Sequence, residues 1–326
     1  MIIVSISVAL TAAVIFYPAL ALGRARRRAV LVPLWAAILL TPLLVPPDRP
    51  FLRLLASVLA VALSAKLYDL HVGAERGDRP DLRTFLLFLP NLASVVLRKL
   101  DAEPRPGRGE GLVRLARAGL GAMIGTALLI AAFHVDWFRI PFAVEHCTKV
   151  VAFFLALVPA TGAAVEVWRL LGGKGRDPMD HPFAARTPAD FWRRYNRPAQ
   201  QFFRDDLFRP LGGLHRPIRA TLATFAISAL IHEYVFDIAV GRIQGHQTVF
   251  FLVQGLAVGA TWGVKPQGWR AVPWTVGTWA FTLASSVLFF ASVNEVVPFY
   301  TGRGAPEKPT TGDPTMSEAE SDQDSI

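Results

Sequence analysis

Residues 217–240 read PIRATLATFAISALIHEYVFDIAV and decide the class of fold. Apart from a basic residue near the start and acidic residues near the end, the stretch is dominated by apolar side chains. An α-helix over these residues would be about 36 Å long at about 1.5 Å per residue. This length exceeds a hydrocarbon core of about 30 Å, so the stretch predicts a membrane-spanning helix.

Blocks of the same kind recur along the chain. Of the 326 residues, 52% are hydrophobic and 18% are charged, against about 25% charged in a typical soluble domain. The composition predicts an all-α, polytopic transmembrane helical bundle of about eight spans, with amphipathic helices in the interface. The expected spans lie near residues 2–22, 29–46, 52–70, 112–134, 148–170, 217–240, 247–263 and 273–297.

The distribution of charge predicts how the bundle sits in the membrane. Loops 71–111, 171–216 and 264–270 are basic, whereas loops 46–50 and 135–147 carry few charges. Basic loops stay on the cytoplasmic side, which explains the net charge of +9 without a nucleic-acid partner. We therefore expect a multi-pass protein of the cytoplasmic membrane, in contact with membrane lipids.

The first span predicts an N-terminus outside. An arginine cluster at 24–28 follows this span, whereas a signal peptide carries its positive charge first. The first span is therefore expected to be retained, with cleavage after the sequence ALA at 20–22 as the alternative.

The chain is expected to form one transmembrane domain over residues 1–300, with a motif region at 187–240. Residues 301–326 are rich in Pro, Thr, Glu and Asp and predict a disordered acidic tail. Residues 81–100 are apolar with charged ends, which predicts a helix lying in the interface. The single cysteine, Cys147, excludes an internal disulfide, and no cluster of ligands predicts a metal site.

Residues 187–213, TPADFWRRYNRPAQQFFRDDLFRPLGG, mix aromatic and basic side chains. Thr187, followed by proline and by Asp190, predicts a capped helix start, and the two later prolines predict short helices. The mixture is typical of the cytoplasmic interface. The segment is either an amphipathic anchor or a binding surface for a phosphorylated amphiphile such as acyl-coenzyme A. Asn196 favours binding, because its carboxamide needs hydrogen-bond partners.

His232 lies about 22 Å along the expected helix 217–240, inside the hydrocarbon zone. An ionisable residue at that depth is by default functional, and the alternative is a histidine hydrogen-bonded to a neighbouring helix. Thr224, Ser228 and His232 follow each other at intervals of four, with Thr221 one turn earlier, so they share one helix face. They predict a hydroxyl-bearing track from the cytoplasmic end to the imidazole.

Other ionisable residues in the spans receive structural interpretations. Glu233 diverges from His232 by about 100° and is expected to pair with another span. Lys66 is expected to extend to the surface from the end of its span. The group Glu145, His146 and Lys149 is interpreted as pairing at the membrane edge.

Three stretches carry a resemblance to a known family. DFWRRYNRP (190–198), RDDLFRPLGG (204–213) and SALIHEY (228–234) together resemble the membrane-bound O-acyltransferase superfamily. The wax-synthase-like branch is the most similar, although Tyr195 stands where tryptophan is commoner. The resemblance covers about residues 190–235, and the rest of the chain is similar only as a run of spans.

The resemblance implies His232 as the catalytic base and Asn196 as its partner. A neutral imidazole can take the proton of an alcohol, and a carboxamide can orient the acceptor or stabilise the thioester oxygen. No cofactor is implied beyond acyl-CoA as co-substrate. The residues expected to bind substrate are Trp192, Arg193, Arg194, Arg197, Thr224, Ser228 and Tyr234, with the arginines placed for the coenzyme A phosphates.

The sequence therefore predicts an acyl-CoA-dependent O-acyltransferase that moves an acyl group onto a lipophilic alcohol, giving a wax ester or another neutral lipid. An alternative acceptor is the hydroxyl of a glycan or secondary metabolite. A further alternative is a non-catalytic membrane scaffold or a transporter.

Overall fold

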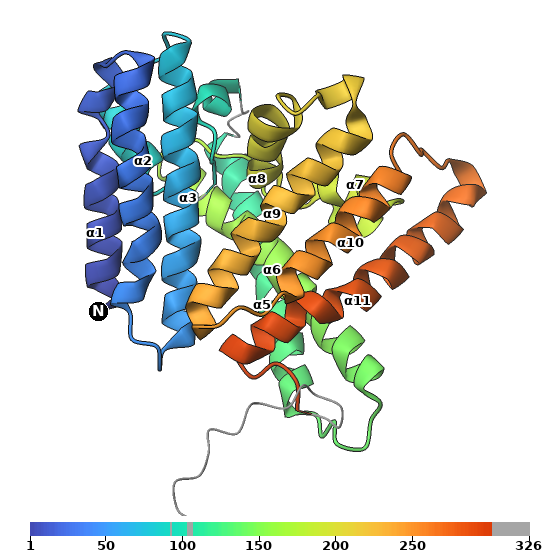
Figure 1. Cartoon of the computed structure of the whole chain (residues 1–326). Helices are drawn as coiled ribbons and strands as arrows, with labels where there is room; N and C mark the ends of the chain where they lie inside the picture. Colours follow the sequence, from blue (N-terminus) through green and yellow to red (C-terminus); the bar gives the residue numbers. More distant parts are fainter. Residues whose placement is uncertain (92, 103–106, 302–326) are drawn as a thin grey trace, which may run out of the picture.

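A computed structural model describes residues 1–91, 93–102 and 107–301 (Figure 1). Within these residues all regular structure is helical, which confirms the predicted fold class. The long helices are α1 (Ile2–Ile15), α2 (Arg24–Leu40), α3 (Pro50–Glu75), α5 (Arg108–His134), α6 (Phe142–Leu170), α9 (Pro217–Val240), α10 (His246–Ala260) and α11 (Ala271–Val296). The short helices are α4 (Leu82–Phe88), α7 (Pro188–Arg194) and α8 (Arg197–Phe202).

The described part of the chain has seven helical segments that are long and apolar enough to cross a membrane, because 3-10 turns extend α1 to Ala21 and α2 to Leu44. The structure differs from the prediction at residues 247–263, because α10 has only 15 residues. Its length of about 22 Å is less than the hydrocarbon thickness of about 30 Å. The helix ends before Gly263, whose φ of 78° is incompatible with a continued right-handed helix. The early end of α10 leaves the following loop free to form part of the site described below.

The long helices form two connected groups (Figure 1). Helices α1, α2 and α3 pack together, and α3 also packs against α9. Helices α9, α10 and α11 lie side by side in chain order, and α11 contacts α6, which pairs with α5. Helices α7 and α8 contact each other, and α7 also packs against α10. The segment that carries the sequence motif therefore lies among the spans and is not separate from them.

Helices α5 and α6 cross at very short range. A Cβ added to Gly125 would lie 2.2 Å from the carbonyl oxygen of Leu155, so the crossing requires glycine. Only 11% of the apolar window of α5 is buried inside the protein. In a membrane the remaining apolar surface of α5 would face lipid, as the sequence predicts for a span.

Lys66 does not extend to the surface, contrary to the prediction. Its side chain is 1% exposed, and Nζ donates hydrogen bonds to the carbonyl oxygens of Phe88, Leu89 and Asn91 at 2.6–2.8 Å. These are carbonyls at and beyond the end of α4, which lack partners within that helix. Lys66 thus satisfies the C-terminus of α4 from inside the bundle.

The predicted interfacial helix at 81–100 is interrupted. α4 covers only Leu82–Phe88, with Asp81 accepting a hydrogen bond from the backbone N–H of Thr84 at its start. A short 3-10 helix follows at Leu97–Ala102. Pro90 lies at the break, because a proline has no backbone N–H to continue the helical hydrogen bonds.

Glu145 and Lys149 form an ion pair, as predicted, and the group Glu145, His146 and Lys149 is buried inside the protein. Lys149 donates to Glu145 at 2.7 Å and to the carbonyl oxygen of Phe299 at 2.7 Å. Glu145 in turn accepts the backbone N–H of Thr301. This ion pair fixes the segment after α11. The predicted tail lies outside the described residues beyond Thr301.

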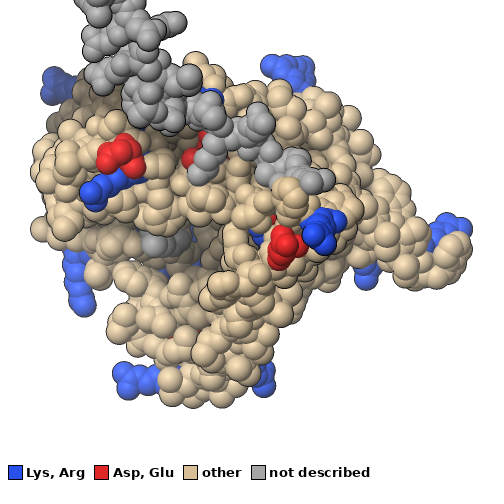
Figure 2. All heavy atoms as spheres, turned by 90° about the horizontal axis from the view of Figure 1, so that it is seen from below, with Lys and Arg blue, Asp and Glu red and all other residues tan. Residues whose placement is uncertain are grey.

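One end of the molecule carries few charges. Seen from below, the surface is mostly uncharged, and acidic side chains lie beside basic ones in two places (Figure 2). The loops between α2 and α3 and between α5 and α6 lie at this end (Figure 1). Both were expected outside the cell from their weak charge, and that orientation stays a prediction.

Candidate active site

The motif segment folds as three consecutive short helical pieces: α7, α8 and a π-helical turn at Phe203–Phe208. As predicted, Thr187 caps α7, because its hydroxyl oxygen accepts the backbone N–H of Asp190 at 3.1 Å. Asn196 separates α7 from α8 with a φ of 45°, in the left-handed region that asparagine tolerates better than most residues.

Asp190 organises the basic side chains of α7. Its carboxylate accepts hydrogen bonds from the side chains of Arg193 and Arg194 and from the backbone N–H of Arg186. Burial opposes ionisation of this carboxyl, but these hydrogen bonds outweigh burial and hold the pKa of Asp190 below its usual range. Asp190 is therefore ionised at neutral pH and holds arginines around one opening.

That opening leads into a cavity of about 980 Å³, here called the main cavity. Its walls come from α7, α8, the π-helical turn, the N-terminal half of α9, and the loop after α10. The acidic side chains at its surface are Asp180 and Asp190, and the basic ones are Arg176, Arg186, Arg193, Arg194, Arg197, Arg204 and Lys265. Basic groups thus outnumber acidic ones, and the main cavity attracts anions.

Two of these cations are available to a ligand. Within the described residues, the side chains of Arg197 and Lys265 make no hydrogen bond or ion pair. Arg197 is held by its backbone, whose N–H donates to the carbonyl oxygen of Pro178 at 2.8 Å. An unpaired guanidinium on a fixed backbone suits phosphate recognition.

The hydroxyl track predicted on α9 lines the main cavity. Thr221, Thr224 and Ser228 all contribute to the wall. Ser228 lies 11 positions after Pro217, so the cavity reaches about 16 Å along α9. The Thr224 hydroxyl donates to the carbonyl oxygen of Ala220, which leaves its lone pairs facing the cavity.

His232 lies one turn beyond the deepest hydroxyl. Its Nδ1 is 2.8 Å from the carbonyl oxygen of Ser228 and 3.5 Å from the Ser228 hydroxyl. Because a carbonyl oxygen only accepts, we assign the proton to Nδ1 and the lone pair to Nε2. Nε2 has no hydrogen-bond partner among the described residues. The ring packs on Phe251 of α10 with centroids 4.1 Å apart.

Trp192 is anchored by a polar chain that the sequence analysis missed. The indole N–H of Trp192 donates to Gln254 at 2.9 Å, and the Gln254 amide donates to Ser285 at 2.8 Å. Gln254 is 1% exposed. The chain links α7 to α10 and α11 and fixes one wall of the main cavity. An amide in the middle of a largely apolar helix was the available signal, because such groups need partners in other helices.

Three predicted site residues, His232, Asn196 and Tyr234, do not line the main cavity. Asn196 is exposed, and its carboxamide oxygen accepts the backbone N–H of Ala199, so it caps α8 and has no described contact with His232. The Tyr234 hydroxyl donates to the carbonyl oxygen of Leu39 on α2. Neither side chain lines the wall. The structure therefore gathers the arginines, Trp192 and the hydroxyl track at one cavity, with His232 behind Ser228 and with Asn196 and Tyr234 elsewhere.

Glu233 contacts another helix, as predicted. Its carboxylate accepts the backbone N–H groups of Gly245 and Thr248 and the Thr248 hydroxyl. These donors belong to the start of α10, where unpaired N–H groups attract an anion. Glu233 thus fixes the N-terminus of the helix whose Phe251 packs on His232.

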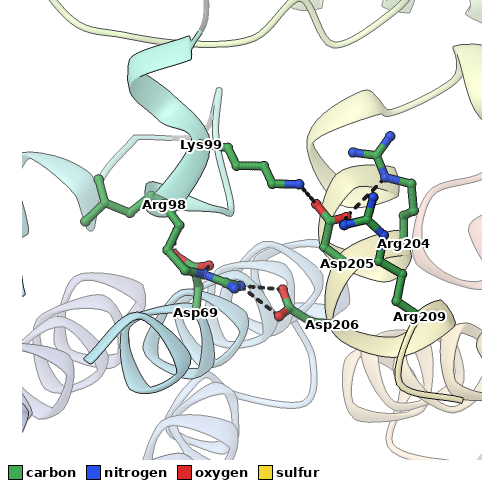
Figure 3. Close-up of polar contacts among 8 residues, drawn as sticks. Asp69, Arg98, Lys99, Arg204, Asp205, Asp206 and Arg209 are labelled. Carbon is green, nitrogen blue, oxygen red and sulfur yellow. Dashed lines mark hydrogen bonds and ion pairs between the residues drawn. The ribbon is translucent and has the colours of Figure 1, made fainter. Parts of the chain in front are cut away.

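The π-helical turn lines one side of the main cavity and is held by ion pairs (Figure 3). Arg98 binds Asp69 of α3 at 2.6 Å and Asp206 at 2.7 Å. Asp205 is bound by Lys99, Arg204 and Arg209. Because residues 97–102 and α3 both contribute, the turn is fixed from two sides.

Residues 164–292 match the model of the MBOAT, membrane-bound O-acyltransferase family. The matched segment runs from the end of α6 into α11 and contains every predicted site residue. The match supports the membrane-bound O-acyltransferase superfamily, and with it a multi-pass membrane protein that transfers an acyl group from a donor to an acceptor. The comparison with curated proteins found no match.

Proposed function

We propose that this protein is an acyl-CoA-dependent O-acyltransferase of the cytoplasmic membrane, similar to wax synthases, with a lipophilic alcohol as acceptor. One observation carries the proposal: the main cavity joins a basic mouth to Ser228, whose carbonyl holds the His232 ring. Its volume of about 980 Å³ suits a large ligand. Arg193, Arg194 and Arg197 at the mouth would bind the phosphates of coenzyme A.

The chemistry needs one base. Nε2 of His232 takes the proton of the acceptor hydroxyl as the oxygen attacks the thioester carbonyl. The carbon–sulfur bond then breaks, and the departing thiolate recovers the proton from the imidazolium. The Ser228 carbonyl stabilises the protonated ring throughout, because Nδ1–H keeps its acceptor. Trp192, Thr224 and Ser228 shape the route along which the reacting groups approach.

The first test replaces His232 with alanine. A general base contributes about 10²- to 10⁴-fold, so turnover of labelled acyl-CoA by membranes should fall at least 100-fold. His134→Ala is the matched control, because His134 is exposed at the end of α5. Unchanged turnover in a folded His232→Ala protein would favour a scaffold or transporter.

Asn196 is proposed to act on the thioester or the acceptor, and its left-handed backbone gives a sharp test. Asn196→Gly keeps that backbone but removes the carboxamide, whereas Asn196→Ala removes the carboxamide and adds strain. A chemical role predicts equal loss of turnover in both variants. If Asn196→Gly keeps turnover and Asn196→Ala does not, the residue is needed only for the turn between α7 and α8.

A second acceptor class is favoured by the polarity of the track. Thr221, Thr224 and Ser228 give a hydrophilic hydroxyl a polar route toward His232. A glycan or secondary-metabolite hydroxyl therefore stays an alternative acceptor. Membranes supplied with labelled acyl-CoA and a panel of alcohols separate the two classes. Esters formed only from long-chain alcohols support the wax-synthase-like proposal, and transfer to soluble sugars supports the alternative.

A further inference from the structure

A second cavity, of about 390 Å³, lies between α2, α3 and the π-helical turn. We refer to it as the α2–α3 cleft. Arg24 and Arg28 from the first turns of α2 and Arg76 from the end of α3 form its basic side. Leu31, Trp35 and Tyr68 form its apolar side. The proposed acyl transfer uses none of these residues.

Two of the three arginines of the cleft, both from α2, share the carboxylate of Glu75 on α3. Arg24 binds Glu75 at 2.8 Å, and Arg28 is 4.0 Å from the same oxygen. Within the described residues, the Arg76 guanidinium makes no hydrogen bond or ion pair. Behind them, the buried Arg27 donates to Nδ1 of His71, whose Nε2 is 2.9 Å from Glu75. The histidine thus fixes Glu75 and leaves excess positive charge at the opening.

Asp205 and Asp206 also face the cleft, but other cations neutralise them (Figure 3). Asp206 binds Arg98, and Asp205 binds Lys99 and two further arginines. Burial opposes ionisation of Asp205, yet hydrogen bonds from Lys99 and Arg204 hold its pKa below the usual range. Both aspartates are therefore committed to the ion pairs that fix the turn, and the cleft remains cationic.

The position of the cleft indicates where its ligand comes from. α2 begins and α3 ends at its mouth, and both lie in segments suited to span a membrane. The apolar wall continues down α2, where Trp35 donates to the carbonyl oxygen of Ser64 and stacks on Tyr68 at 5.9 Å. Val32, also in the wall, is 61% exposed. The cleft is therefore cationic at the membrane boundary and apolar toward the bilayer.

We propose that the α2–α3 cleft binds an anionic phospholipid, with its phosphate held by Arg24, Arg28 and Arg76 and its acyl chains against Leu31 and Trp35. Basic pockets between spans attract anionic headgroups, and each basic residue near such a surface strengthens binding about fivefold. The apolar wall favours a lipid over a free anion, which gains nothing from it. This proposal is independent of acyl transfer.

The test is a lipid titration of the purified full chain followed by native mass spectrometry. Phosphatidylglycerol is compared with phosphatidylcholine, and inorganic phosphate is added as competitor. The variants are Arg76→Gln and the double variant Arg24→Gln/Arg28→Gln. Arg26→Gln is the matched control, because Arg26 is exposed on the same turn of α2 but does not line the cleft.

We expect one phosphatidylglycerol to bind at least about tenfold more tightly than phosphatidylcholine. Arg76→Gln should weaken that binding about fivefold and the double variant about 25-fold, with Arg26→Gln unchanged. Arg76 has no described partner, so its loss of binding cannot be assigned to lost internal contacts. Equal loss in Arg26→Gln, no preference for phosphatidylglycerol, or full displacement by millimolar phosphate would each overturn the proposal.

Discussion

Replacing Glu233 with glutamine separates a structural carboxylate from a catalytic one next to His232. The carboxylate accepts two backbone N–H groups and one hydroxyl at the start of α10, from Gly245 and Thr248. Glutamine keeps the shape and one accepting oxygen. Glutamine removes the negative charge and replaces the second oxygen with an NH₂ group, which would face the N–H and O–H donors of α10.

The size of the effect follows from these contacts. Loss of a charge-assisted hydrogen bond costs about 1.5–3 kcal/mol, and loss of an anion at a helix N-terminus costs about 0.3–1 kcal/mol. We therefore expect Glu233→Gln to lower the free energy of unfolding by about 2–4 kcal/mol. We expect turnover to fall only to the extent that a displaced α10 shifts Phe251, which packs on His232. The pH dependence of turnover should not change.

The assay is unfolding in mixed micelles, with turnover measured on the same preparations. Glu295→Gln is the control, because Glu295 pairs at 2.9 Å with Arg242, whose side chain is 49% exposed. An exposed pair of this kind contributes about 0–1 kcal/mol. The reasoning would be refuted by a Glu233→Gln protein as stable as wild type that has lost turnover, because the carboxylate would then act in the chemistry.

Three further substitutions test the fold around the site. Gly125→Ala should lower the free energy of unfolding by about 3 kcal/mol, because the new Cβ would clash with the Leu155 carbonyl. Gly119→Ala is the control, because the space around Gly119 is open, and it should be neutral or slightly stabilising in the same unfolding assay. Lys66→Met should cost about 3 kcal/mol or more by leaving three carbonyl oxygens unsatisfied, and hydrogen exchange should show α4 opening first. Asp190 has a folded-state pKa below its usual value, so its stabilising contribution is present above about pH 4 and is lost as the pH falls through the folded pKa. The stability difference between wild type and Asp190→Asn should therefore be constant near neutral pH and shrink in acid.

Local features of this fold could be predicted from sequence because their causes are local. The Thr187 cap depends on residues three positions apart, and its geometry was expected. The direction of Glu233 follows from the angle between successive helix positions, and its contact with α10 was also expected. The hydroxyl track lies along one wall because residues four apart share a face.

Features that depend on distant partners could not be predicted. The side chain of a lysine near the end of a span normally reaches water. The side chain of Lys66 points inward instead, because it binds the backbone carbonyls of Phe88 and Asn91, which lie more than 20 positions later in the chain. The sequence around Gln254 does not indicate that its carboxamide oxygen accepts the indole N–H of Trp192. The early end of α10 depends on a turn whose sequence is apolar enough to continue a span.

The position of Asn196 follows from competition between its backbone and its side chain. The left-handed turn between α7 and α8 needs a residue that tolerates positive φ, and the carboxamide that permits this then caps α8. A direct approach to His232 would require the cap to Ala199 to open and the side chain to turn away from α8. The cost is about one weak hydrogen bond, at 3.4 Å, within the range that binding of a charged substrate beside Arg197 can supply. A role of Asn196 in the proposed transfer therefore requires this cap to open, and the Asn196→Gly and Asn196→Ala variants test that requirement.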